Sequence, residues 1–293
     1  MKLIAIMPVR NSDWILGLTA RAALMWCDGL VLLNHASTDG TARICGDLFR
    51  ESPGRVSIIE ERGGTWAEMA HRQRLLDEAR RMKDTHIALV DDDECLSGNL
   101  LPTIRGHIEQ TPERLIFCLS WILLRGSIHK CHIRGPWCMA DVSTAFRDAP
   151  EWSWSAAAQG GYDHHHRHPW GHPWIPFAPI RRQDGGMMHL QAVSDRRVRA
   201  KALLYCLVER LRWPDRKTPA ELSKQYGLAV YDERPEFLEN LGDVPACWWE
   251  AYERAGLMQY LHPESEPWQL SQARAMIREH PGIEKGLDTF GVL

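Results

Sequence analysis

The sequence predicts an α/β protein in which a mostly parallel sheet is flanked by helices and followed by a helical C-terminal extension. Three observations carry this prediction. Apolar runs of strand length alternate with helix-spaced segments between residues 2 and 93. Several of these runs lack polar residues, which is typical of parallel strands that are buried on both faces. From Val193 onward the pattern becomes helical.

Strands and helices alternate in the first part of the chain. KLIAIMPV at 2–9 is predicted to be a buried strand that a proline closes. Helical spacing follows at 14–26, where Ser12 or Asp13 supplies the N-cap. The remaining predictions are a strand with a polar turn at 29–41, strands at 55–61 and 85–93, and helices at 41–53 and 65–83.

The second part of the chain departs from this alternation. The sequence predicts a strand at 114–126, further strands or loops after it, and an irregular stretch rich in Trp, His, Pro and Gly at 150–189. The predicted helices lie at 194–213, 219–227, 246–261 and 269–280. We therefore expect one large domain over residues 1–205 and a helical extension over 206–293 that packs on it.

Composition and charge narrow the class of protein. The net charge is −3, so no global field draws the chain to nucleic acid or to an anionic membrane. The eight cysteines include no CxxC pair, which indicates reduced thiols rather than a disulfide scaffold. The N-terminal apolar stretch ends at Pro8 and Arg10, unlike a signal peptide, and the run at 115–124 is too short for a membrane span. We expect a soluble cytoplasmic protein; the sequence leaves its oligomeric state open.

Four consecutive acids, Asp91, Asp92, Asp93 and Glu94, follow the apolar run IALV. Acids at the carboxyl end of a parallel strand lie where open α/β sheets bind ligands. A divalent cation would relieve their repulsion, and oxygen ligands suit Mg²⁺ or Mn²⁺. On an extended chain Asp91 and Asp93 point to one side and Asp92 to the other. The alternative is an acidic turn that caps a helix near Leu100.

Three further segments precede the acids in a fixed order. IMPVRNSDWIL ends the first predicted strand, LLNHASTDGTARI ends the second, and RGGTWAEMAHRQRLLDEA leads into ALVDDDE. Together they resemble the family 2 glycosyltransferases of the GT-A fold, whose strands end in Pro-x-x-Asn, in Ser-x-Asp-Gly-Thr and in Asp-x-Asp, often extended by Glu. The resemblance covers residues 3–100 well and extends more weakly to 205. It implies a GT-A, Rossmann-like fold and transfer of a sugar from a nucleotide-diphosphate donor.

The same resemblance implies roles for individual residues. Asp91 would face the ribose or sugar and would also be a ligand of the metal. Asp93 would bind Mn²⁺ or Mg²⁺ on the diphosphate. Glu94 matches the trailing Glu, and His189 matches a late His that closes the metal shell. The predicted donor-binding residues are Pro8, Val9, Arg10, Asn11, Asn34, Asp39, Arg62, Asp91, Asp92, Arg197 and Lys201.

One departure from the family concerns the nucleotide. Many members carry an acidic pair before Ser-x-Asp-Gly, where this chain has Asn34 and His35. The family's Asp at this point contacts the base, and Asn34 is able to hydrogen-bond a uracil edge. We expect a UDP-sugar donor, while the departure leaves the identity of the base open.

The catalytic base is expected in the acceptor-side loops at 126–190. GYDHHHRHPWGHPW at 161–174 holds five of the fourteen histidines but lacks the spacing of a zinc site. We interpret it as an acceptor-side loop in which Asp163 or one of His164, His165 and His166 acts as the base. Glu151, beside two tryptophans, is a further candidate.

The predicted reaction transfers the sugar to an acceptor hydroxyl, with inversion, as the resemblance implies. The acceptor is expected to be a glycan, a protein, or a hydroxymethylated DNA base of the kind that phage enzymes use in the host cytoplasm. A basic stretch at 181–201 would serve a DNA acceptor. The alternatives are a nucleotidyltransferase, which PVRNSDW disfavours because it is not a basic Gly-rich loop, and a non-catalytic nucleotide-sugar-binding protein, which the intact Asp-x-Asp-Glu disfavours.

Overall fold

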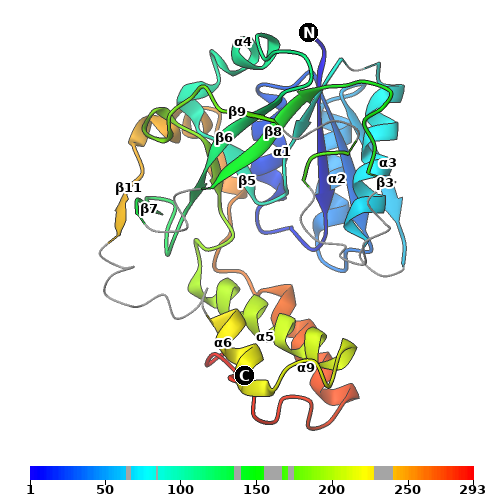
Figure 1. Ribbon diagram of the computed structural model, residues 1–293, viewed down its shortest axis with the longest axis vertical. Helices are drawn as coiled ribbons and strands as arrows, with labels where there is room; N and C mark the ends of the chain where they lie inside the picture. The colour runs from blue at the N-terminus through cyan, green and yellow to red at the C-terminus, as the bar shows by residue number, and fades with distance from the viewer. Residues whose placement is uncertain (64–66, 84, 135–139, 155–166, 171–174, 228–239) are drawn as a thin grey trace. The chain divides into compact units, whose positions relative to one another are not determined.

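The computed structural model describes residues 1–293 except 64–66, 84, 135–139, 155–166, 171–174 and 228–239 (Figure 1). A mixed sheet with helices on its two faces confirms the predicted α/β class. The chain divides into two compact units, each described by itself below. The first contains Met1–Ile122, Met139–His189 and Pro245–Leu261, and the second contains Leu123–Cys138, Leu190–Val244 and His262–Leu293. The predicted division at residue 205 stays a prediction.

Four parallel strands form the first half of the sheet in unit 1. They are β1 (Leu3–Val9), β2 (Gly29–His35), β3 (Val56–Glu61) and β4 (His86–Leu89). β1 pairs with β2 on one side and with β4 on the other, so the strand order is β3-β2-β1-β4. The direction of chain progression therefore reverses between β1 and β4. Open α/β sheets bind their ligands at the carboxyl ends of the strands at such a reversal point.

The second half of the sheet is largely antiparallel. β8 (Asp141–Arg147) lies between β4 and β6 (Ile116–Leu123), and β10 (Met187–His189) lies between β6 and β5 (Glu94–Leu96). The short strand β9 (Pro176–Phe177) pairs with β6. Pairing of β10 with β5 sets His189 opposite Glu94. A residue late in the chain is thus brought to the acidic cluster by backbone hydrogen bonds.

The predicted strand at 85–93 is shorter in the structure. β4 ends at Leu89, and β5 begins at Glu94 after a turn that the Glu94 N–H closes on the Asp91 carbonyl at 3.1 Å. Three adjacent carboxylates repel one another less in a turn, where each can face a different partner. The alternation expected for an extended strand therefore does not apply to Asp91, Asp92 and Asp93.

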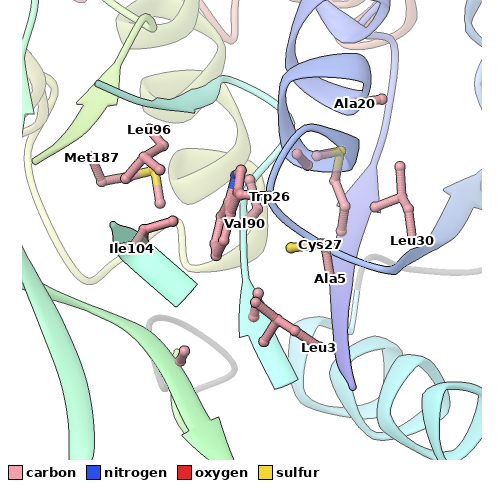
Figure 2. Close-up of a cluster of buried hydrophobic side chains, with 14 of the residues drawn as sticks. Leu3, Ala5, Ala20, Trp26, Cys27, Leu30, Val90, Leu96, Ile104 and Met187 are labelled. Atoms are coloured by element: carbon pink, nitrogen blue, oxygen red, sulfur yellow. The ribbon is translucent and has the colours of Figure 1, made fainter. Parts of the chain in front are cut away.

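Both faces of β1, β2 and most of β4 are buried, whereas the edge strand β3 is partly exposed. Leu3, Ala5 and Met7 of β1 join one apolar cluster with α1 (Leu16–Leu24), α2 (Thr41–Glu51) and α4 (Ile104–Glu109), part of which Figure 2 shows. Ile4 and Ile6 join the opposite cluster with α3 (Glu68–Arg81). This alternation explains why β1 lacks polar residues. Helices α1, α2 and α3 match predicted segments, whereas α4 was not predicted. Three short turns of helix, Gly98–Leu100, Arg182–Asp184 and Ala246–Trp248, also belong to unit 1, as do α8 (Glu250–Arg254) and Leu257–Tyr260.

Unit 2 has an apolar core of its own. It contains α5 (Asp195–Arg212), α6 (Pro219–Gly227), α9 (Trp268–Glu279) and a two-stranded sheet of β7 (Lys130–His132) and β11 (Leu241–Asp243). Leu203, Leu207 and Phe290 are among its fully buried side chains. Among the helices described in either unit, none combines the length and apolar character that a bilayer crossing requires.

Candidate functional site

The loop after β1 and the turn after β4 meet at the reversal point of the sheet. The Ser12 hydroxyl donates a hydrogen bond to the Asp92 carboxylate, and the Thr19 hydroxyl donates to the Asp92 carbonyl at 2.8 Å. These bonds attach the acidic turn to the start of α1. The candidate site is therefore built at the point that the strand order alone indicates for a ligand.

The loops after β1 and β2 fix each other. Asn11 has a positive φ of 51°, a conformation that Asn tolerates better than most residues. Its N–H donates to Ser37 Oγ at 2.9 Å, and its Oδ1 accepts from the Thr38 N–H at 2.7 Å. The Ser12 N–H donates to Thr41 Oγ1 at 2.7 Å. Two strand ends that are far apart in the sequence thus form one rigid rim.

Asp39 takes part in this rim through the backbone. Its two oxygens accept from the N–H groups of Asp13, at 3.2 Å, and Thr41, at 2.9 Å. The Asp13 carboxylate in turn accepts from the Gly40 N–H at 3.1 Å. These bonds are those of a structural turn, and the role of Asp39 as a donor contact stays a prediction.

The three aspartates of the acidic turn face three different partners. Asp91 accepts from Arg72 at 3.0 Å and from Arg167 at 2.8 Å. Asp92 accepts from the Ser12 hydroxyl, and Asp93 lies 3.2 Å from Nε2 of His189. Each carboxylate therefore has a distinct electrostatic environment.

These environments separate the acidities of two neighbouring carboxyl groups. Burial raises the pKa of Asp91, but the guanidinium groups of Arg167 and Arg72 outweigh it and hold the pKa well below its ordinary value. Burial and the adjacent negative charge of Asp93 raise the pKa of Asp92 to about 8. Asp91 is therefore ionised throughout the physiological range, whereas Asp92 retains its proton at neutral pH.

The buried side chain of Glu94 fixes the acidic turn by accepting several hydrogen bonds. Its side chain is 0% exposed. It accepts from the Trp121 indole N–H at 3.0 Å, from Arg167 at 2.9 Å and from the Asp91 N–H at 3.0 Å. A buried carboxylate needs this density of donors. The trailing Glu thus has a structural reason to be present at this position.

Arg72 approaches Asp91 from α3. Its side chain is 3% exposed and donates to Glu68, one turn earlier, as well as to Asp91. Its Nη1 is buried without a hydrogen-bond partner among the described residues. A buried cationic donor that lacks an acceptor is costly unless a ligand supplies one.

Asp93 and His189 form the part of the cluster that suits a cation. Their side chains are 21% and 12% exposed, and the His189 ring stacks on Trp121 with 4.6 Å between ring centroids. Two ligands at right angles on an ion with bonds of about 2.1 Å lie about 3 Å apart, which the 3.2 Å separation of Asp93 and His189 fits. Among the described residues no group of three or more His, Cys, Asp or Glu side chains is arranged to hold a metal. The pair therefore suits an ion that substrate oxygens complete.

Polar groups also gather at the ends of β1, β2 and β3. Nη1 of Arg10 lies 3.4 Å from Nδ1 of His35, whose ring packs against His71 at 4.7 Å. Burial and the charge of Arg10 lower the pKa of His35. The Asn34 side-chain amide donates a hydrogen bond to Glu60 at 2.9 Å. Its Oδ1 is buried and accepts no hydrogen bond within the described part of the chain.

Four further predicted site residues, Pro8, Val9, Arg62 and Glu151, belong to unit 1. Pro8 and Val9 are buried within β1 at its carboxyl end, and Arg62 is exposed just after β3. Glu151 is exposed on the surface of unit 1. Asp163, His164, His165 and His166 lie outside the described residues, so their roles stay predictions.

Arg197 and Lys201 belong to α5 in unit 2. Arg197 is buried there and donates to the carbonyls of Pro263 and Ser265, both at 2.9 Å. Lys201 is half-buried, and its ammonium lies 5.4 Å from the centroid of the Tyr205 ring. Within their unit Arg197 holds the chain before α9, and the role of both cations in donor binding stays a prediction.

Sequence reasoning missed Arg72, Trp121 and Arg167. Arg72 lies four residues after Glu68 on an amphipathic helix, a pairing that sequence can indicate but that looks like a surface pair. Trp121 lies in an apolar run that reads as core. Arg167 meets Asp91 across 76 residues of chain, a contact for which the pattern offers no signal.

Comparisons with known proteins give no family assignment. No family model matches the chain, and no curated protein matches it either. Among solved structures, TarS 1–349 of S. aureus aligns with 97% of this chain and 90% of its own at 13% identity and a TM-score of 0.43. The mannosyltransferase PcManGT of Pyrobaculum calidifontis, solved with GDP-Man and Mn²⁺, aligns with 99% of this chain and 86% of its own at 13% identity and a TM-score of 0.40. At these scores neither likeness carries an argument about this chain.

Proposed function

We propose that this protein is a metal-dependent glycosyltransferase that moves a sugar from a nucleotide-diphosphate donor to an acceptor hydroxyl. The observation that supports this proposal best is that the acids of the turn face different partners. Asp91 and Glu94 are matched by guanidinium groups, whereas Asp93 faces His189 at 3.2 Å. One carboxylate and one imidazole suit an ion whose shell the donor's phosphates complete.

The proposed roles follow from these contacts. Asp93 and His189 hold Mn²⁺ or Mg²⁺, which when bound neutralises the negative charge that grows on the leaving diphosphate. Asp91, oriented by two arginines, accepts hydrogen bonds from hydroxyl groups of the donor. Because it is already committed to Arg72 and Arg167, we assign it to the donor rather than to the metal.

The nucleotide is proposed to lie along the rim at the ends of β1 and β2. Arg10 and Asn11 directly follow β1, and Asn34, close to the end of β2, is the proposed contact of the base. The buried Oδ1 of Asn34 and the Nη1 of Arg72 lack partners within the described chain, which supports the presence of a polar ligand near this edge. We propose a UDP-sugar as the donor.

The acceptor hydroxyl requires a base. In an inverting transfer the acceptor oxygen forms its bond to the anomeric carbon as the bond to the diphosphate breaks, and the base takes the hydroxyl proton. Asp163, His164 and Glu151 remain the proposed candidates. The proposed acceptors are a glycan or a protein, with a hydroxymethylated DNA base as the less favoured case because the net charge is −3.

A single assay tests this proposal. The protein is incubated with Mn²⁺ and a panel of nucleotide sugars, with and without acceptors, and in separate reactions with nucleoside triphosphates and sugar phosphates. The released products are then identified. Release of a nucleoside diphosphate from one donor, abolished by a chelator, is the expected result. Release of inorganic pyrophosphate from a nucleoside triphosphate and a sugar phosphate would instead identify a nucleotidyltransferase. Binding of a nucleotide sugar with no product in the presence of acceptors would identify a non-catalytic binding protein.

A further inference from the structure

Arg167 has a hydrogen-bond acceptor for every donor that it carries. A guanidinium group has five N–H donors in a fixed planar arrangement. Nε donates to the Ser143 carbonyl at 2.8 Å, Nη1 to Asp91 at 2.8 Å and to Glu94 at 2.9 Å, and Nη2 to the Leu89 carbonyl at 2.8 Å and to Glu94. The side chain is 12% exposed. All five donors of this largely buried guanidinium are therefore satisfied within unit 1.

The guanidinium lies where two strands of the sheet separate. The described pairing of β4 with β8 ends at Ala88 and Ala145. One residue further along β4, the Leu89 carbonyl accepts from Arg167, and so does the Ser143 carbonyl of β8. The side chain therefore replaces the backbone ladder at the point where β4 gives way to the acidic turn. The distance between the turn and β8 is set by one planar group.

The same group reaches the cation-binding pair through Glu94. Arg167 and the Trp121 indole N–H both donate to Glu94 Oε1, at 2.9 Å and 3.0 Å. Trp121 stacks on His189, which lies 3.2 Å from Asp93. A shift of the Glu94 carboxylate would thus be passed to the ring that faces the cation.

Lysine could not take this position. Its ammonium is a compact point charge with three donors, whereas two carboxylates and two carbonyls here surround a planar fork. A lysine would preserve the charge and lose the geometry. The substitution therefore separates neutralisation of the acids from their alignment.

We propose that Arg167 is a positioning residue that aligns Asp91 directly, and the Asp93–His189 pair through Glu94 and Trp121, for the cation and the donor. The inference rests on the proposed function for the identity of the donor, but cation binding tests it separately. It assigns a role to the one arginine of the His-rich tract at 161–174, which sequence alone did not connect with the acidic turn.

The experiment compares Arg167→Lys with wild type and with Arg80→Lys as the matched control. Arg80 also holds a carboxylate through two nitrogens, donating to Asp148 at 2.8 and 2.9 Å and to the carbonyls of Ala149 and Trp152, and these partners lie outside the acidic turn at 91–94. Binding of Mn²⁺ alone is measured from the loss of the free-ion EPR signal, thermal unfolding is measured in parallel, and kcat and KM are measured with the donor that the panel identifies.

The expected result is that Arg167→Lys weakens Mn²⁺ binding by about 10- to 100-fold, as loss of a partner of a metal ligand does, while Arg80→Lys leaves it unchanged. With a donor that turns over, kcat should fall by a similar factor with little change in KM.

If the two variants lower the melting temperature alike and bind Mn²⁺ like wild type, Arg167 is only structural and the proposal is wrong. Absence of Mn²⁺ binding by wild type would also overturn it. Mn²⁺ binding lost in Arg167→Lys without turnover of any donor would leave the positioning role in place and overturn the proposed function alone.

Discussion

Asp91, Asp92 and Asp93 are adjacent in the sequence, yet their side chains contact arginine, serine and histidine respectively. The sequence predicts the cluster, its place after a buried strand and its interest as a cation site. It does not predict which acid faces which partner, because that depends on a turn in place of an extended strand. Arg72 and Arg167, which decide the charge of the site, are joined to it only by the fold. The residue types of this candidate site are thus more predictable from the sequence than the contacts between their side chains.

Substitution of Asp93 tests the proposed cation site at the scale of one carboxylate. Asp93→Asn keeps the size of the side chain and removes the charge that would hold the ion. Metal-dependent release of the nucleoside diphosphate should fall by more than about 100-fold, since even the partners of metal ligands cost 10–100-fold. The measurement is product release at saturating donor.

Asp47→Asn is the matched control for this substitution, because Asp47 pairs with Arg43 and Arg50 on α2, in contact with none of the site residues. Its activity should equal that of wild type. Survival of metal-dependent release in Asp93→Asn would show that the metal ligands lie elsewhere.

Asp92 predicts a specific dependence of stability on pH. Its pKa in the folded state is raised to about 8, against an ordinary value near 4, so the folded state holds a proton that the unfolded chain has lost. The free energy of unfolding in metal-free buffer should therefore fall as pH rises from about 4 to about 8, by at most about 1.4 kcal/mol per pH unit from this group. Urea unfolding across this range measures the slope.

Asp92→Asn should flatten that slope while its side-chain oxygen still accepts the Ser12 hydrogen bond. Groups outside the acidic turn titrate alike in the two proteins, so the difference between the curves reports Asp92 together with the acids that it interacts with. Parallel curves for wild type and Asp92→Asn would contradict the assignment of a retained proton to this carboxyl group.

Elements with a clear apolar run or helical spacing were the most predictable part of the fold. β1, β2, β3, α1, α2, α3, α5 and α6 fall within the predicted segments, and α9 begins one residue before its predicted segment, because apolar runs and helical spacing directly reflect burial. The antiparallel strands were less predictable. β8 lies in a stretch expected to contain strands or loops and β10 in the stretch expected to be irregular, and their neighbours in the sheet are set by pairing with distant residues. The periodicity of apolar residues predicts a strand or helix but not the neighbouring strand with which it pairs.

Gly186 tests how closely β10 must approach β6. A Cβ at this position would lie 2.3 Å from the Ser120 carbonyl oxygen and 2.9 Å from Ile122, so Gly186→Ala forces the strands apart. We expect a loss of about 1–3 kcal/mol in the free energy of unfolding and weaker Mn²⁺ binding, because β10 carries His189. Urea unfolding and the Mn²⁺ EPR titration measure the two effects.

Gly46→Ala is expected to raise the free energy of unfolding, whereas Gly186→Ala is expected to lower it. Gly46 lies within α2, and a Cβ there would meet nothing within 4 Å. Alanine should stabilise the chain by about 0.5–1 kcal/mol, because glycine in a helix loses more conformational freedom on folding. Equal effects of the two substitutions would show that β10 tolerates displacement and that contact with β6 does not fix His189.

At the scale of the whole molecule, the chain forms two compact units built from interleaved segments. The sequence predicts a change of character towards helices in its later part, which unit 2 confirms with α5, α6 and α9. It does not predict that residues 123–138 join that unit, because this depends on the pairing of β7 with β11 more than a hundred residues later. Each unit has an apolar cluster with its own fully buried leucines.

Separate cores predict separate losses of stability. Leu207 is fully buried in the cluster of unit 2 and Leu75 in a cluster of unit 1, so each Leu→Ala substitution should cost about 2–5 kcal/mol where it is made. Hydrogen exchange read by mass spectrometry should show Leu207→Ala losing protection in α5, α6 and α9 while β1 and β2 keep theirs. Leu75→Ala should show the reverse, and only Leu75→Ala should weaken Mn²⁺ binding, since the proposed ligands Asp93 and His189 belong to unit 1. Loss of protection throughout the chain in both variants would mean that the two cores unfold as one cooperative unit, in which case the division by contacts has no thermodynamic counterpart.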